Sequence, residues 1–128
     1  MASTWYDKGL ALRKEILGEQ YVEKQLKEAD DFNQPLQEMV TEYCWGWLWN
    51  RPGLPKKTRS MLNLALLATL NRHQEFKTHV KGALKNGCTR GEISEVLLQV
   101  AMYSGIPAGV EAFRLAREAF RELDGSGA

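Results

Sequence analysis

Residues 89–101, TRGEISEVLLQVA, decide the fold class of this chain of 128 residues. Thr89 and Glu92 have the T-x-x-E spacing of a capping box, in which each side chain accepts a hydrogen bond from the other residue's backbone N–H at a helix start. Apolar side chains then recur at i, i+3, i+4, i+7 and i+8, and they are Ile93, Val96, Leu97, Val100 and Ala101. The segment therefore predicts an amphipathic helix that ends near Ser104-Gly105.

Helical periodicity extends over nearly the whole chain, and no segment shows the sustained alternation of a β-strand. Turn sequences such as NRPG at 50–53 and NG at 86–87 separate the periodic segments. We expect an all-α fold, a compact bundle of about six helices in one domain over residues 1–128, with a frayed tail at 124–128. The predicted helices are 5–17, 35–49, 55–70, 74–85, 89–104 and 107–123, and segment 21–31 adds one or two helical turns.

Two of these helices have faces that the sequence assigns to the core. Helix 55–70 is so rich in apolar residues between Leu62 and Ala68 that little polar surface remains, which predicts a place in the middle of the bundle. In helix 107–123, the predicted buried stripe consists of Val110, Phe113, Ala116, Phe120 and Leu123.

Composition and charge narrow the possible functions. Seventeen Lys and Arg against sixteen Asp and Glu leave a formal charge of +1 with no basic tract, so we expect no nucleic-acid partner. The longest nearly apolar run, 61–70, is about half of a bilayer span, and the first residues lack a secretory signal, so we expect no membrane association. Cys44 and Cys88 have neither a CxxC partner nor a metal-ligand spacing. This favours free thiols, no metal site and a cytoplasmic location.

The polar residues that follow the break at 71–73 offer acid-base chemistry. Arg72, Glu75 and His79 project on one side of the predicted helix, if that helix includes all three. A carboxylate four residues before an imidazole favours the protonated ring, so we expect the pKa of His79 to lie near or above neutrality, where the ring can donate a proton. The same spacing is also typical of an ordinary exposed ion pair.

Three tryptophans lie within five residues of each other. Trp45 and Trp49 share a helical face, whereas Trp47 points elsewhere. Such a cluster is typical of a core or a subunit contact, and it could also form the wall of a pocket. Arg51, in the following turn, could bond helix carbonyls or present its guanidinium to a substrate carboxylate. Tyr103 could line a cavity or simply end its helix.

Seven ordered blocks of the sequence carry a family resemblance. They are WGWLWNRPGL (45–54), TRSMLNLALLA (58–68), EFKTH (75–79), GALKNG (82–87), EI (92–93), EVLL (95–98) and YSGIPA (103–108). Over residues 5–123 the chain thereby resembles the carboxymuconolactone decarboxylase family of the alkylhydroperoxidase-like superfamily. Redox members of that superfamily carry Cys-x-x-Cys-x-x-x-His where this chain has Arg72, Glu75 and His79. Without the two thiols a dithiol peroxidase mechanism is excluded, which favours the decarboxylase branch.

The resemblance implies an alkylhydroperoxidase-like fold, a homo-oligomer, commonly a hexamer, and decarboxylation of 4-carboxymuconolactone to the 3-oxoadipate enol-lactone in aromatic catabolism. Electrons left by CO2 can flow through the ring double bond to the lactone carbonyl, so the substrate is its own electron sink and no cofactor is expected. We assign His79 as the proton donor and Glu75 as the residue that orients and charges it. The residues assigned to substrate binding are Arg51, Arg72, Trp45, Trp49 and Tyr103, with Arg59 as a further candidate for the carboxylate.

Two other functions stay open at the level of sequence. The same Glu75 and His79 could isomerise or hydrolyse a related small lactone. Alternatively, the chain could be a non-catalytic helical oligomer whose tryptophans form only an interface.

Overall fold

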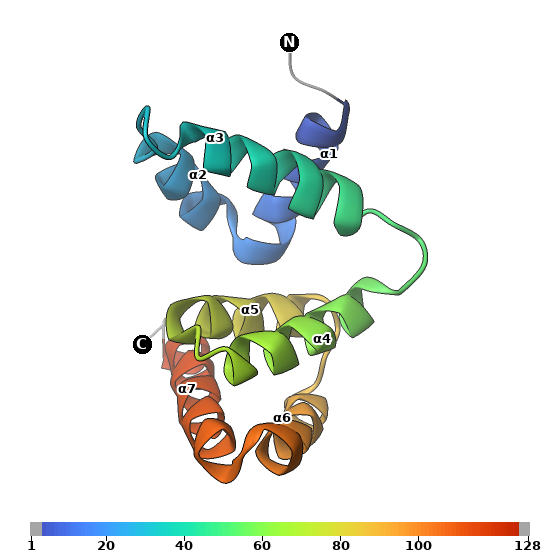
Figure 1. Cartoon of the computed structure of the whole chain (residues 1–128), viewed down its shortest axis with the longest axis vertical. Helices are drawn as coiled ribbons and strands as arrows, with labels where there is room; N and C mark the ends of the chain where they lie inside the picture. Colours follow the sequence, from blue (N-terminus) through green and yellow to red (C-terminus); the bar gives the residue numbers. More distant parts are fainter. Residues whose placement is uncertain (1–3, 126–128) are drawn as a thin grey trace. The chain divides into compact units, whose positions relative to one another are not determined.

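The computed structural model describes residues 4–125, and every element in that range is helical, which confirms the all-α prediction (Figure 1). The helices divide between two compact units, Met1–Pro55 and Lys56–Ala128. No helix within residues 4–125 is long and apolar enough to cross a membrane. The elements are α1 (Thr4–Leu17), α2 (Glu19–Lys27), α3 (Gln34–Met39), the π-helix η1 (Val40–Leu48), α4 (Lys56–Thr69), α5 (His73–Lys85), α6 (Arg90–Ser104) and α7 (Ile106–Gly125).

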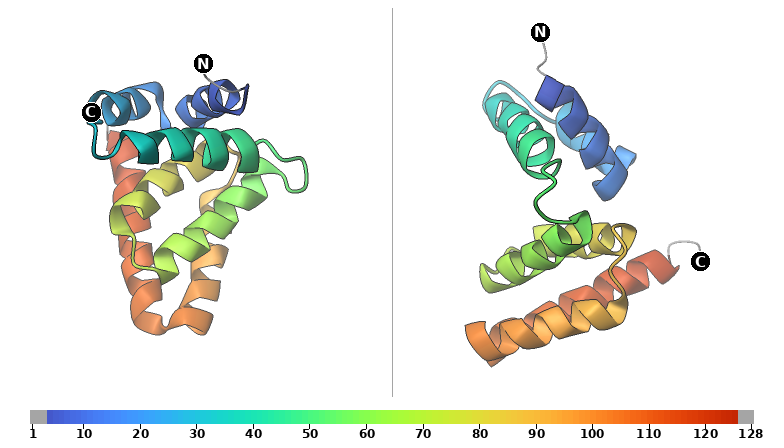
Figure 2. Two further views of the ribbon diagram at one scale, coloured as in Figure 1. Left: turned by 45° about the horizontal axis from the view of Figure 1, so that its top comes forward. Right: turned by 90° about the vertical axis from the view of Figure 1, so that its right-hand side faces the viewer.

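In the first unit, α1 packs directly on η1 because both helices carry a glycine where they cross (Figure 2). A Cβ added to Gly9 would lie 1.9 Å from the carbonyl oxygen of Thr41, and one added to Gly46 would lie 2.0 Å from the carbonyl oxygen of Trp5. Both distances are far below a van der Waals contact, so only glycine allows this crossing. The core beside it consists of Leu12, Ile16, Trp45 and Trp49.

The second unit consists of α4, α5, α6 and α7, in which α7 packs against both α5 and α6 (Figure 2). Its core is formed by thirteen buried residues from all four helices and the α5–α6 loop. The predicted capping box is present at the start of α6: the Thr89 hydroxyl accepts from the Glu92 backbone N–H at 3.0 Å, and the Glu92 carboxylate accepts from the Thr89 N–H at 2.9 Å. The turn before α6 also follows the prediction, since Gly87 has a φ of 97°.

Two of the predicted buried faces are wrong in part. On α4, Leu62 and Leu66 are 49% and 58% exposed, so this helix is not surrounded on all sides. Leu70, the predicted end of this helix, lies just after α4 and is also 58% exposed. On α7, Val110 and Leu123 are exposed. The side of α7 that enters the core instead carries mainly small residues, because these allow close packing of the helices: Gly109, Ala112, Leu115, Ala116 and Ala119.

The predicted end of the last helix is also too early. Asp124 and Gly125 belong to α7, and the Asp124 carboxylate accepts a hydrogen bond from Arg90 at 2.7 Å. This ion pair holds the last turn of α7 against the start of α6, where the sequence predicted a frayed tail. The rest of that predicted tail, residues 126–128, lies outside the described residues.

Removing the capping hydroxyl with Thr89→Ala is expected to lower the free energy of unfolding by about 1 kcal/mol, because the backbone N–H of Glu92 loses its side-chain acceptor. Chemical denaturation measures this change. Thr89→Ser, which keeps the hydroxyl, is the matched control and should recover most of the loss. Equal stability of the Ala and Ser variants would contradict a role for the capping box.

Candidate functional site

The predicted site residues are divided between the two units. Trp45, Trp49 and Arg51 belong to the first unit, and the others belong to the second. Trp45 and Trp49 form a stacked pair with ring centroids 4.8 Å apart and an interplanar angle of 12°. Both are almost fully buried, with exposures of 2% and 1%, whereas Trp47 is 43% exposed. The shared face of Trp45 and Trp49 is therefore confirmed, and the pair is part of the core of the first unit.

Arg51 lies in the turn after η1, where its guanidinium stacks at 4.9 Å over the ring of the exposed Trp47. The neighbouring residue Asn50 bonds two carbonyls at this end of η1. The Asn50 Nδ2 donates to the carbonyl oxygens of Trp45 at 2.9 Å and Gly46 at 3.3 Å. Sequence reasoning did not single out Asn50, although an Asn at a helix end that must leave carbonyls unpaired is a usable signal.

A buried guanidinium in the first unit was also missed. Arg13 is 5% exposed, and its Nη1 donates to the Gln37 side chain at 3.0 Å and to the Thr41 hydroxyl at 3.2 Å. Burial lowers the pKa of Arg13, and its Nε has no hydrogen-bond partner within residues 4–125. Burial also raises the pKa of the nearby Cys44 thiol, so Cys44 is a weak nucleophile. The two hydrogen bonds from Arg13 connect α1 to α3 and η1.

In the second unit, α5 carries the predicted acid-base pair. Arg72 is the exposed N-cap of α5, so the helix does not include it and the condition for a face shared by all three residues is not met. Glu75, in the first turn, is also exposed, whereas His79, one turn later, is half-buried. Their order on α5 places the carboxylate one turn before the imidazole, as expected from i, i+4 spacing.

The direction of the His79 pKa is opposite to the prediction. Burial lowers the pKa of His79 from the ordinary 6.5 to about 4. The expectation that Glu75 would hold the ring protonated is therefore wrong for the free protein, because desolvation of the charged ring outweighs an exposed carboxylate in water. At neutral pH the free protein contains a neutral imidazole at this position.

The lowered pKa of His79 predicts an acid-dependent loss of stability. The unfolded chain, in which this histidine titrates near 6.5, binds a proton between pH 6.5 and pH 4 that the folded chain does not bind. Allowing for the residual exposure of the ring, the free energy of unfolding should fall by about 2 kcal/mol over this range. Urea titrations at several pH values measure the fall. It should be absent in His79→Asn and retained in His73→Asn, which changes an exposed residue; retention in both would contradict the burial effect.

Tyr103 lies in the last turn of α6 and is 85% exposed, so it lines no enclosed cavity in this chain. Two further polar groups of the second unit are structural. The fully buried Ser60 accepts a hydrogen bond from the Asn86 side chain at 2.9 Å, and burial raises the pKa of the Cys88 thiol. Both cysteines are free, as predicted. Within the described part of the chain, no group of three His, Cys, Asp or Glu side chains could hold a metal ion.

Comparison with known proteins identifies the family of this chain. Residues 34–118 match the Carboxymuconolactone decarboxylase family. The chain is 40% identical over 118 residues to 4-carboxymuconolactone decarboxylase of Acinetobacter baylyi, covering 92% of this chain and 88% of the relative. It is also 40% identical over 118 residues to nitrosuccinic acid decarboxylase of Metarhizium robertsii, covering 92% and 82%. The chain therefore belongs to the carboxymuconolactone decarboxylase family.

Proposed function

We propose that this chain is an enzyme, a carboxy-lyase that converts 4-carboxymuconolactone to the 3-oxoadipate enol-lactone. The observation that carries the proposal is the 40% identity over 92% of the chain to a relative of that name. The relative that acts on nitrosuccinic acid is equally similar, and its name describes the same kind of reaction. In both reactions the substrate can accept the electron pair that CO2 leaves, on a lactone carbonyl in one and on a nitro group in the other.

The reaction consumes one proton: the C–CO2⁻ bond breaks, CO2 leaves, and the carbon α to the lactone carbonyl gains hydrogen. His79 is proposed as the proton donor, and Glu75, one turn before it on α5, as the residue that orients the ring. A neutral imidazole in the free protein must first gain a proton. The substrate carries two carboxylates, which raise the pKa of a neighbouring imidazole, so binding of substrate supplies the charged donor.

Recognition of the remaining carboxylate is proposed for Arg51, whose guanidinium is exposed beside Trp47, with Arg72 as the second candidate. Trp45 and Trp49 support this end of η1 from the core, and Tyr103 is proposed as an exposed ring that contacts substrate. Removal of water from around the carboxylate that departs favours its loss of charge.

Product analysis tests the proposed reaction. Purified protein incubated with 4-carboxymuconolactone should give a product lighter by the mass of CO2, with one deuterium next to the lactone carbonyl when the solvent is heavy water. A product heavier by one water would identify a hydrolase, an isomer of equal mass an isomerase, and unchanged lactone a non-catalytic protein. A metal chelator should leave the rate unchanged, because the substrate supplies the electron sink.

We also propose a homo-oligomer, as the family resemblance implies, with a hexamer as the expected size. The second unit exposes an apolar surface that a further copy of this chain would cover. Leu62 and Leu66 on α4 and Leu70 just after it recur every fourth residue and are each about half exposed. Light scattering after gel filtration measures the assembly, and Leu66→Glu should dissociate it; a monomeric wild-type chain would contradict this proposal.

We also propose a cytoplasmic location. The free, buried Cys88 is consistent with a reducing compartment.

A further inference from the structure

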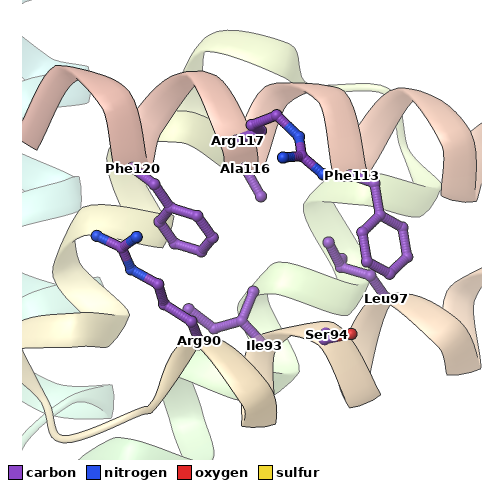
Figure 3. A pocket seen from close by; sticks show the side chains of 8 residues that line it. All are labelled: Arg90, Ile93, Ser94, Leu97, Phe113, Ala116, Arg117 and Phe120. Carbon is purple, nitrogen blue, oxygen red and sulfur yellow. The ribbon is translucent and has the colours of Figure 1, made fainter. Parts of the chain in front are cut away.

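A pocket of about 190 Å³ lies between α6 and α7, on a different pair of helices from His79 (Figure 3). Phe113 and Phe120, two turns apart on α7, lie at opposite ends of the pocket, and Ile93 and Ala116 lie between them. Ile93 and Ala116 are buried core residues, so the floor of the pocket is rigid and apolar. None of the residues assigned to the decarboxylation lines this pocket. The complete lining is Arg90, Ile93, Ser94, Leu97, Phe113, Ala116, Arg117 and Phe120.

The volume of the pocket suits a ligand that places one ring inside it. Pockets that enclose drug-sized molecules or cofactors are typically about 300 Å³ or larger, so this pocket cannot enclose a nucleotide or a fused ring system. A single six-membered ring with one small substituent does. Two aromatic side chains at the ends of the pocket favour a flat ring, because edge-to-face contacts between rings add to the effect of apolar burial.

Two arginines, Arg90 and Arg117, lie at the rim of the pocket, and only Arg90 forms an ion pair with a carboxylate. Arg90 donates to Asp124 at 2.7 Å, and its guanidinium stacks at 4.4 Å over Phe120. The side chain of Arg117 makes no ion pair or hydrogen bond with any residue in the range 4–125, whereas Arg114 on the same helix is paired with both Glu111 and Glu118.

Figure 3 shows the Arg117 guanidinium extending along α7 toward Phe113 at one end of the pocket. Ser94, which also lines the pocket, can donate a hydrogen bond from its hydroxyl. One unneutralised guanidinium beside an apolar floor complements one negative charge on an apolar ring. A dianion would leave its second charge against Phe113 or the buried floor without a partner, which is unfavourable.

We propose that the α6–α7 pocket is a second ligand site, which binds a monocarboxylate that carries a single aromatic ring. The ring lies between Phe113 and Phe120 on Ile93, and the carboxylate accepts hydrogen bonds from Arg117 and Ser94. The site does not depend on the proposed decarboxylation, because it uses none of the residues assigned to that reaction.

Benzoate is the probe, followed by NMR of the Ile93 and Leu97 methyl groups in the full-length protein. Saturable shifts of these methyls are expected at millimolar benzoate. Benzamide has nearly the same shape and no charge, and it should bind at least about tenfold more weakly. Absence of saturable shifts at these methyls, or equal affinity for benzamide, would overturn the proposal.

Variants distinguish benzoate binding in this pocket from nonspecific attraction of an anion to the positive charges of α7. Arg117→Gln should weaken benzoate binding about tenfold or more, because it removes the pairing guanidinium. Arg121→Gln removes the same charge from an exposed position one turn later that does not line the pocket, and it should bind benzoate as the wild type does. His79→Asn should also bind normally. Equal effects of Arg117→Gln and Arg121→Gln, or loss of binding in His79→Asn, would assign the binding elsewhere.

Discussion

His79→Asn is expected to lower kcat for 4-carboxymuconolactone by at least about 100-fold, because general acid catalysis by a positioned side chain typically contributes about 10² to 10⁴-fold. Asn keeps a polar side chain, smaller than that of His, but has no titrating proton. Steady-state kinetics with the lactone measures the effect. If His79 acts only in the chemical step, KM should change little, since the interaction is made in the transition state.

The low pKa of His79 in the free protein gives this prediction a second readout. At pH 7 the free imidazole is neutral, so a dianionic analogue that raises its pKa must take up close to one proton per site when it binds. Calorimetry in buffers of different ionisation enthalpy measures that uptake. It should disappear in His79→Asn and persist in His73→Asn, which removes the other, exposed histidine.

Glu75→Gln separates the positioning role from a structural one. If Glu75 orients His79, the variant should lower kcat, narrow the pH range of activity and leave the fold intact, because Glu75 is exposed and contributes little to packing. Near-normal turnover in His79→Asn would remove His79 from the mechanism. Normal turnover in Glu75→Gln alone would remove Glu75 and leave His79 as the donor.

The helices of the second unit could be read from the sequence because their signals are local. Thr89 and Glu92 act within one turn, and Gly87 supplies a left-handed backbone at a single position. The pKa of His79 could not be predicted in this way. Its main cause is burial, which depends on packing by residues distant in sequence, whereas the Glu75 spacing describes one neighbour in water.

The sequence pattern also did not predict that η1 is a π-helix. Spacing of Trp45 and Trp49 fits an ordinary helix equally well, so the segment 35–49 was predicted as one regular helix. The i→i+5 hydrogen bonds of η1 occur where this helix contacts α1 and the buried Arg13. These contacts are made by residues distant in sequence, so local spacing does not predict them. For the same reason, the sequence did not show that Gly9 and Gly46 are contact residues, because each glycine in isolation resembles a weak position within a helix.

Gly46→Ala is expected to destabilise the first unit by about 3 kcal/mol or more. The added methyl would lie 2.0 Å from the carbonyl oxygen and 2.6 Å from the carbonyl carbon of Trp5, and both atoms belong to backbone that cannot rotate away. Overpacking of a core usually costs about 1 to 3 kcal/mol, and a clash with backbone is at the upper end because a whole helix must move. Thermal or urea unfolding of the full chain measures the loss.

Gly53→Ala is the matched control, since no atom lies within 4 Å of a Cβ added there and the substitution also reduces the entropy of the unfolded chain. The stacked pair of Trp45 and Trp49 supplies a local readout, because near-ultraviolet circular dichroism reports their fixed geometry. In Gly46→Ala that signal should weaken before the helices of the second unit unfold, whereas in Gly53→Ala it should match the wild type. A Gly46→Ala variant as stable as Gly53→Ala would show that α1 and η1 do not touch at this glycine.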